Sequence, residues 1–147
     1  MMTPHWRLRF LKIAEEVSGW SKDPSTKVGA VVVSQDRKKI AVGYNGPARS
    51  LNDKKWLDGD RGKRLSVTLH AELNALLSAP FDPSGCWLFV YGAFPCTQCA
   101  SVIVQREIVS VVCYKEQMLE RWSPKLSMEI LNEGGVNVVI HSLKKSK

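Results

Sequence analysis

Short apolar runs rich in β-branched residues recur along this chain of 147 residues. They cover residues 28–33, 40–44, 86–91, 109–113 and 136–140. Each run has the length and composition of a buried strand, and polar or glycine-containing segments separate them. Longer stretches with helical spacing of apolar residues lie between most of the runs. This alternation predicts an α/β fold, a three-layer α/β/α sandwich around a mixed sheet of about five strands, the later strands being parallel.

The segments between the runs differ in character. Helical periodicity is expected over 6–20 and 68–79, from about 97 onward, and over 117–131. The first two runs are separated only by a short polar stretch, which predicts a β-hairpin. Residues 48–66 are dense in Asp, Lys and Arg and show little periodicity. We expect a long surface loop there, of the kind that serves as a lid or binding element.

Composition sets the broad class. With 44% hydrophobic and 24% charged residues, the chain suits one globular domain over residues 1–147. It has no apolar run near the ~20 residues of a membrane span and no secretory signal, so a cytoplasmic location is expected. The net charge of +7 favours an anionic partner. Part of this charge lies in the tail 144–147, which we interpret as a solvated end rather than a nucleic-acid arm.

Two motifs at predicted helix starts carry the chemistry. A His-x-Glu motif spans His70 to Glu72, and a Pro-Cys-x-x-Cys motif contains Cys96 and Cys99. Three ligands, His70, Cys96 and Cys99, would leave the fourth tetrahedral position of a zinc ion open, as a catalytic site requires. Glu72 can then point beside the open position and move protons. Each fragment alone is weak, since a lone Cys-x-x-Cys can be a redox pair, but together they match the signature of zinc deaminases.

Other reactive or aromatic residues are expected to be structural. Cys86 and Cys113 fall in predicted strands and should pack as small hydrophobes. His5 and His141 lie outside the motifs and are interpreted as surface or cap residues. Core or interface packing is the expected role of the tryptophans, with Trp56 in the candidate lid as the exception. Six basic residues of the 48–66 region could bind a nucleotide phosphate, or could equally be solvated: Arg49, Lys54, Lys55, Arg61, Lys63 and Arg64.

Four segments together resemble the deoxycytidylate (dCMP) deaminase family, and the resemblance spans nearly the whole chain. They are residues 27–33, the Gly-Tyr-Asn-Gly turn at 43–46, residues 70–75 and residues 95–100. The turn is the most discriminating piece. The resemblance implies zinc-dependent hydrolysis of dCMP to dUMP and ammonia, serving dTTP supply, with Glu72 protonating N3 and then the leaving amine. It also implies that the Ala71 N–H holds the base carbonyl, that the Pro95 carbonyl meets the amine, and that Asn45 contacts the sugar.

The same resemblance implies a homo-oligomer, a hexamer in the allosteric members of the family, with dCTP and dTTP as effectors. Lys27, Gly46 and Arg49 are the candidate effector or phosphate-binding residues. Many such members carry a second, structural zinc held by Cys or His after the Gly-Tyr-Asn-Gly turn. Residues 48–69 contain neither residue type, so one zinc per chain is expected. The sequence leaves open whether regulation is retained.

Two rival functions stand beside this interpretation. One is a deaminase of the same fold that acts on tRNA adenosine or on another nucleoside or nucleotide, which a basic balance would favour. The Gly-Tyr-Asn-Gly turn argues against it. The other is a non-enzymatic binding module in which zinc supports only the fold. The presence of Glu72 argues against that.

Overall fold

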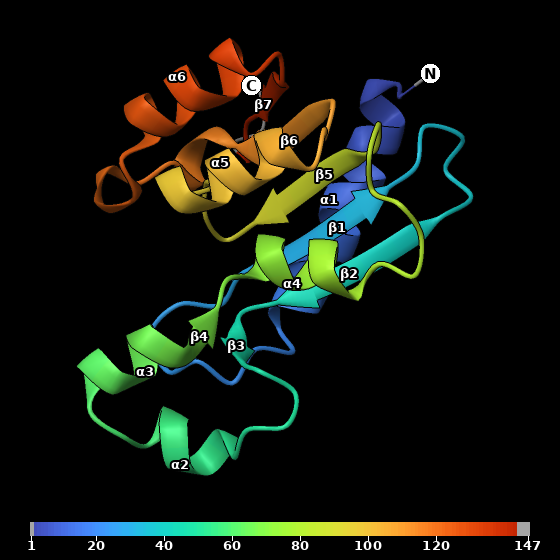
Figure 1. Cartoon of the computed structure of the whole chain (residues 1–147). Coiled ribbons are helices and arrows are strands. Elements are labelled where there is room, and N and C mark those ends of the chain that lie inside the picture. Colours follow the sequence, from blue (N-terminus) through green and yellow to red (C-terminus); the bar gives the residue numbers. More distant parts are fainter. Residues whose placement is uncertain (1, 144–147) are drawn as a thin grey trace.

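The computed structural model describes residues 2–143, which fold into a five-stranded mixed sheet with helices on both faces (Figure 1). The strands are β1 (Gly29–Val33), β2 (Ile40–Tyr44), β5 (Trp87–Tyr91), β6 (Ser110–Tyr114) and β7 (Asn137–His141). Their order in the sheet is β2-β1-β5-β6-β7. The strand β1 is antiparallel to both β2 and β5, whereas β5, β6 and β7 run parallel. The predicted sandwich, with its hairpin first and its parallel strands later, is confirmed.

Helix α1 (Pro4–Ser18) covers one face of the sheet. It begins where the Thr3 hydroxyl accepts a hydrogen bond from the Trp6 N–H at 3.3 Å, and Pro4 fits the first turn because that position needs no N–H donor. Its buried side chains, among them Phe10 and Leu11, pack with those of β1, β5 and β6. One half of the hydrophobic core therefore lies between α1 and the sheet.

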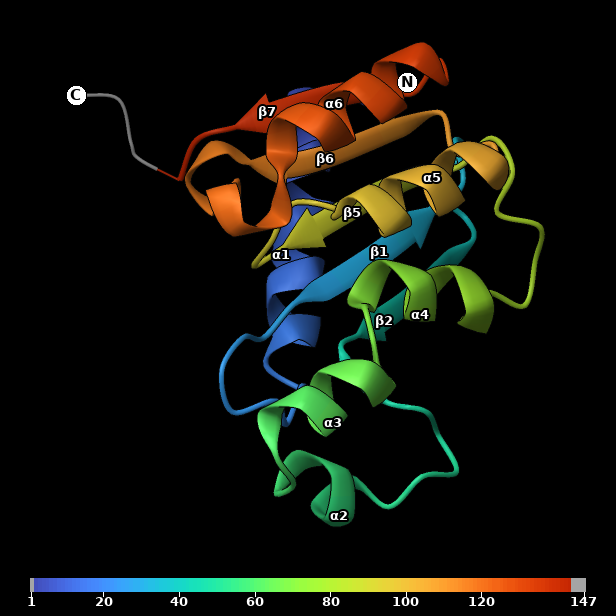
Figure 2. The same ribbon diagram turned by 60° about the vertical axis from the view of Figure 1, so that its left-hand side comes forward.

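Three helices cover the opposite face: α4 (Ala71–Ser78), α5 (Thr97–Gln105) and α6 (Pro124–Glu133). Figure 2 shows them as a layer across the sheet from α1. The chain passes through α5 between β5 and β6, and through α6 between β6 and β7, as parallel pairing requires. The larger part of the core lies here, and it buries Cys86 and Cys113 as predicted.

The region after β2 differs from the surface loop that we predicted over residues 48–66. It contains two short helices, α2 (Asp53–Leu57) and α3 (Arg61–Val67), between the paired segments β3 (Gly46–Pro47) and β4 (Thr68–Leu69). Neither helix buries a residue, so apolar periodicity could not reveal them. Side-chain caps begin both: Asn52 accepts from the Lys55 N–H at 2.9 Å, and Asp60 from the Lys63 N–H at 3.0 Å.

The helix expected over 117–131 also needs correction. Residues Lys115–Gln117 and Glu120–Trp122 form two 3₁₀ turns, η1 and η2, and α6 begins only at Pro124. Ser123 has a left-handed backbone, with φ at 51°, and this interrupts the helical path. Proline then opens α6 because it cannot sit inside a longer helix without removing a hydrogen bond. The α4 helix likewise starts at Ala71 rather than at 68, since Thr68 and Leu69 pair with β3.

No helix within residues 2–143 is long and apolar enough to cross a membrane. The basic tail 144–147, interpreted from sequence as a solvated end, lies outside the described residues.

Candidate active site

His70 and Cys96 occupy equivalent positions at the starts of neighbouring helices. Each is the N-cap of its helix, His70 for α4 and Cys96 for α5, with an extended backbone (φ −69°, ψ 151° and φ −69°, ψ 173°). An N-cap side chain commonly accepts a hydrogen bond from its own helix, but neither of these does. Both side chains are therefore available for another partner.

The side chains of His70, Cys96 and Cys99 converge. Their ligand atoms lie within 4.8 Å of one another, and His70 Nδ1 is 3.2 Å from Cys99 Sγ and 3.5 Å from Cys96 Sγ. A tetrahedral zinc with bonds of ~2.0–2.3 Å separates its ligand atoms by roughly 3.3–3.8 Å, so the spacing suits it. One imidazole and two thiols also fit zinc's preference and leave a fourth position open. Within residues 2–143 this is the one group of three or more His, Cys, Asp or Glu side chains close enough to hold a metal.

The charges of these donors also favour a cation. A hydrogen bond from Cys99 and a second from His70 lower the pKa of Cys96 to about 4, so Cys96 is a thiolate at neutral pH. The bond to Cys96 and burial raise the pKa of Cys99, which keeps its proton in this arrangement. The bond to Cys96 also raises the pKa of His70. A bound divalent ion displaces such a proton, so both sulfurs would become thiolates with zinc in place.

Glu72 lies in the first turn of α4 and is almost fully buried, with 3% of its surface exposed. Its burial raises the pKa of the carboxyl, because the charged form loses its hydration. A carboxyl whose pKa is raised holds a proton more readily than an exposed one, which suits a group that must accept a proton and then release it in general acid–base catalysis. Glu72 lines the same cavity as His70 and Cys96.

This cavity has a volume of about 180 Å³ and lies where the starts of α4 and α5 meet α3 and the segment before β1. His70, Ala71, Glu72 and Cys96 form one side of it. The apolar lining is Val28, Leu65, Ala93, Phe94 and Trp122, and the remaining polar lining is Asp23, Ser25, Thr26, Asn45, Arg61, Thr68 and Arg121. A planar, partly polar ring could be enclosed here, with its edge directed toward Glu72 and the metal ligands.

The predicted substrate-binding residues are only partly brought together. Asn45 and Ala71 line the cavity, whereas Pro95 is buried beside it and does not contribute to its lining. The Asn45 side chain is tied to the segment before β1: its Nδ2 donates to the Thr26 carbonyl at 2.8 Å, and its Oδ1 accepts from the Val28 N–H at 2.9 Å. Asn45 therefore holds that wall of the cavity, and its predicted contact with a sugar stays a prediction.

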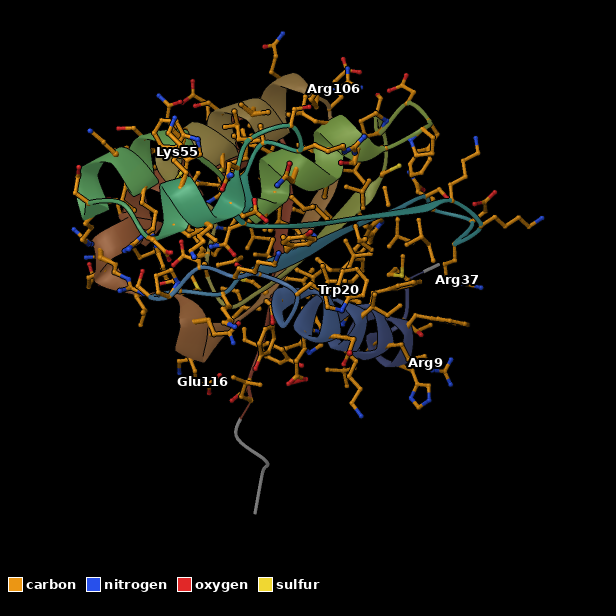
Figure 3. The ribbon with its side chains drawn as sticks, turned by 90° about the horizontal axis from the view of Figure 1, so that it is seen from below. Arg9, Trp20, Arg37, Lys55, Arg106 and Glu116 are labelled. Atoms are coloured by element: carbon orange, nitrogen blue, oxygen red, sulfur yellow. The ribbon has the colours of Figure 1, made fainter. Side chains whose placement is uncertain are left out.

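The candidate effector residues lie elsewhere. Gly46 and Arg49 line a second cavity of about 250 Å³ on the other side of the Gly-Tyr-Asn-Gly turn, together with Lys22 and Asn45. Lys27 is exposed and lines neither of these two cavities. Lys55, one of the basic residues of this region, projects from α2 (Figure 3), and its ammonium lies 4.6 Å from the Trp56 ring. Trp56 lines neither cavity.

Sequence reasoning missed the contribution of Arg121 and Trp122. Trp122 packs against the hydrophobic core, as predicted, and the same half-buried side chain also lies in the cavity wall, which was not predicted. Both residues lie in η2, and no sequence motif marks this turn. The one available signal was Pro124, because a proline there prevents the segment before it from continuing as part of the same helix. The histidines outside the motif stay structural: His5 is exposed, and His141 Nε2 accepts from Arg7 Nε at 3.1 Å.

Comparison with known proteins agrees with this geometry. Residues 4–115, a span that contains both motifs, match the family model of the cytidine and deoxycytidylate deaminase zinc-binding region. The chain belongs to the cytidine and deoxycytidylate deaminase family. It is a zinc-dependent hydrolytic enzyme, and the group of His70, Cys96 and Cys99 fits one catalytic zinc. The predicted resemblance is thereby confirmed.

Individual relatives of this deaminase cover nearly all of its length. An uncharacterized deaminase from the luxG 3′ region of Aliivibrio fischeri is 42% identical over 93% of the chain and 94% of the relative. The human deoxycytidylate deaminase is 28% identical over 89% of the chain and 76% of the relative. The crystal structure of dCMP deaminase from cyanophage S-TIM5, in complex with dCMP and dUMP, superposes with a TM-score of 0.77 at 27% identity, over 96% of this chain and all of that one.

Proposed function

We propose that this deaminase hydrolyses dCMP to dUMP and ammonia, and so serves pyrimidine deoxynucleotide metabolism and the supply of dTTP. The observation that carries the proposal is the meeting of a three-ligand zinc site and the buried carboxyl of Glu72 in one cavity. A zinc site with three protein ligands is open for chemistry, and a buried acid beside it can move protons. The cyanophage relative, whose structure contains dCMP and dUMP, supports the choice of base and sugar.

Each step is assigned to a residue of the cavity. Zinc held by His70, Cys96 and Cys99 would lower the pKa of a water from ~15.7 toward ~7. Glu72 takes a proton from this water as its oxygen bonds to C4 of cytosine, and it passes the proton to N3. Glu72 then carries the second proton to the amine, the C4–N bond breaks, and ammonia leaves. The sum is dCMP plus water to dUMP plus ammonia.

Three further contacts orient the base and sugar in this proposal. The Ala71 N–H is at the start of α4, where backbone donors have no partner within the helix, and it donates to the base carbonyl. The Pro95 carbonyl accepts from the amine. One amide hydrogen of Asn45 is donated to the Thr26 carbonyl, and the other is left to donate to a sugar hydroxyl.

Ammonia release from a panel of substrates tests the reaction and its rivals. We expect the zinc-loaded protein to turn over dCMP faster than CMP, deoxycytidine or a tRNA hairpin containing a target adenosine. Turnover of the hairpin alone would establish the rival tRNA adenosine deaminase. Turnover of none of them, by folded protein with zinc bound, would favour a binding module in which zinc serves the fold.

Regulation by dCTP and dTTP, in a homo-oligomer of six subunits, is also part of the proposal. The second cavity supports it, because Arg49 supplies positive charge and Asn45 lines both cavities. Lys22 also lines this cavity, paired with Asp53 at 3.3 Å. A ligand that moved the turn carrying Asn45 would move the wall of the catalytic cavity, which is the physical requirement for coupling. Adding each nucleotide during the dCMP assay, with sedimentation in parallel, tests both points. We place the enzyme in the cytoplasm, where a reducing environment keeps thiol ligands available.

A further inference from the structure

A short loop, residues 92–95, joins the end of β5 directly to the zinc ligand Cys96. Ala93 and Phe94 of this loop are buried and line the catalytic cavity. The carbonyl of Pro95, its last residue, is the proposed acceptor for the substrate amine. The exact path of these four residues therefore affects both the shape of the cavity and the orientation of the reacting group.

Gln117, a residue outside the cavity lining, holds the start of this loop. Its Oε1 accepts a partly buried hydrogen bond from the Gly92 N–H at 2.8 Å. In the part of the chain that the structure describes, this is the one hydrogen bond that residues 92–95 make. The rest of the loop is held by packing, so its position depends strongly on where Gly92 lies.

Close packing also restricts Gly92. A Cβ at this position would collide with the Lys27 carbonyl oxygen, so the loop begins in close contact with the segment before β1. The φ of Gly92 is 98°, a backbone conformation that glycine adopts readily and other residues do not. Gly92 is thus fixed by two contacts, packing against Lys27 and the polar contact with Gln117.

The side chain of Gln117 has a defined orientation. Burial and the Glu15 carboxylate raise the pKa of Tyr91, and the Tyr91 hydroxyl interacts with the side chains of both Glu15 and Gln117. The hydroxyl keeps its proton, so it can donate to Glu15 and accept from the Gln117 amide. Since an amide nitrogen cannot accept a hydrogen bond, Oε1 of Gln117 must face the Gly92 N–H. Both ends of this amide therefore have a partner.

The turn that carries Gln117 is itself anchored to the sheet. Gln117 is the last residue of η1, and the residue before it, Glu116, binds the chain just beyond β7. The Glu116 carboxylate accepts from the Ser142 hydroxyl at 2.7 Å and from the Leu143 N–H at 2.8 Å. Figure 3 shows Glu116 beside this end of the described chain. The Gln117 amide is thus presented to the loop from a fixed base.

We infer that Gln117 is a positioning residue for the deamination, which sets the loop of residues 92–95 through its bond to Gly92 and so aims the Pro95 carbonyl at the substrate amine. The inference rests on the proposed function, because it concerns how the same site orients its substrate. Gln117 acts only through the backbone of the loop. A displacement of about 1 Å in a group that orients the substrate can cost roughly 10²-fold in rate, so one such bond is enough to matter.

The test compares zinc-loaded wild type with Gln117→Leu, using dCMP as substrate. Leucine has a similar size and no acceptor, so the Gly92 N–H loses its partner. We expect kcat to fall about 10- to 100-fold while KM changes by less than about threefold, because the loop orients the reacting amine and does not supply most of the binding. Zinc should stay bound at one ion per chain, since all three ligands remain.

Gln117→Glu is the conservative variant. A carboxylate oxygen can still accept from the Gly92 N–H, so kcat should stay within about threefold of wild type. The Glu15 carboxylate lies on the other side of Tyr91, and repulsion between the two acids should lower the free energy of unfolding. A rate that followed stability in urea, and not the presence of the acceptor, would overturn the inference.

Gln35→Leu is the matched control. Gln35 Nε2 donates to the Gly85 carbonyl at 3.0 Å, so this glutamine side chain also bonds to the backbone of a glycine. Gly85 comes before β5, whereas Gly92 follows it, which places the control bond at the end of the strand away from the metal ligands. Gln35→Leu should leave kcat and KM unchanged.

Hydrogen exchange of the Gly92 amide gives a second readout that needs no substrate. It should be faster in Gln117→Leu than in wild type, and close to the wild-type rate in Gln117→Glu. A wild-type kcat in Gln117→Leu, or equal losses in the leucine and glutamate variants, would overturn the inference and leave the proposed function standing. Zinc-loaded wild type without activity on dCMP would overturn the proposed function, and the exchange rates would still decide whether Gln117 holds the loop.

Discussion

Asp23 is the residue that most clearly links local structure to the site. Burial opposes ionisation of its carboxyl, but hydrogen bonds from the Thr26 and Ser25 backbone outweigh burial, and its pKa lies below the ordinary value. A carboxyl with a lowered pKa stabilises the folded state above its unfolded pKa, near 4, and this stabilisation is lost as the pH falls through the folded value. The charged carboxylate of Asp23 thus holds the backbone of Ser25 and Thr26, which form one wall of the cavity.

We expect Asp23→Asn to reduce the free energy of unfolding at pH 7 by about 1–2 kcal/mol, because neutral hydrogen bonds replace charge-assisted ones. The difference between the two proteins should shrink below pH 4, where the wild-type carboxyl also becomes neutral. Urea unfolding at pH 7 and at pH 3 measures it. Asp36→Asn is the comparison variant. It removes a carboxylate of the exposed hairpin that accepts hydrogen bonds from Ser34 Oγ and the Lys38 N–H, and it should leave dCMP turnover unchanged. A difference that grew at low pH would contradict this account of Asp23.

The elements that carry the site are positioned by close contact with the sheet. Gly43 of β2 lies against the backbone of α4, so a Cβ there would collide with the Ala75 nitrogen and lie 2.7 Å from the Ala71 carbonyl oxygen. Gly29 of β1 allows the same close contact with α1 on the other face of the sheet, because a Cβ there would collide with the Ala14 carbonyl oxygen. Because His70 and Glu72 lie at the start of α4, the distance between β2 and α4 also positions the metal ligand and the acid.

Replacing Gly43 by alanine should therefore displace α4. We expect Gly43→Ala to destabilise the protein by about 2 kcal/mol or more, because backbone atoms cannot move aside as a flexible side chain can. Gly46→Ala is the control, since a Cβ at Gly46 meets nothing within 4 Å. It should change stability by no more than about 0.5 kcal/mol. Equal effects of the two substitutions in thermal or urea unfolding would show that close packing at Gly43 is unimportant.

The sequence predicted the elements that have an apolar pattern and missed those held by polar contacts. The five strands and α1, α4 and α5 follow from their apolar residues, because each buries such residues in the core, and β1 and β6 are buried on both faces. Helices α2 and α3 bury nothing and depend on the Asn52 and Asp60 caps, so pattern alone could not find them. The metal ligands were predictable because the short spacings within His-x-Glu and Pro-Cys-x-x-Cys together match a known signature. Arg121 and Trp122 were not, because they reach the cavity only through the fold of the whole chain.

At the scale of the whole molecule, the zinc site joins two helices that begin far apart in the sequence. His70 comes from the start of α4, and Cys96 and Cys99 come from the start of α5. A metal that binds only the folded arrangement stabilises that arrangement by mass action. The chain should unfold as one cooperative unit if residues 1–147 form the single domain that its composition predicts.

Removal of zinc tests this link. We expect a chelator to lower the Tm in a single transition and added zinc to restore it, with a gain of about 4 kcal/mol at free zinc a thousandfold above Kd. Cys96→Ser should lower the Tm and abolish the response to zinc. Cys86→Ser, which alters a buried cysteine of the core, should lower the Tm and retain that response. Stability independent of zinc in the wild type would rule out a metal that joins α4 to α5.

The central claim is that Glu72 moves protons for hydrolysis at a zinc held by His70, Cys96 and Cys99. The most direct measurement is dUMP formation from dCMP by wild type and by Glu72→Gln, with zinc content determined for the same samples. The account predicts turnover by wild type and a fall in kcat of at least about 10²–10⁴-fold in the variant, with zinc still bound at one ion per chain. A variant that keeps its zinc and deaminates dCMP at the wild-type rate would contradict it.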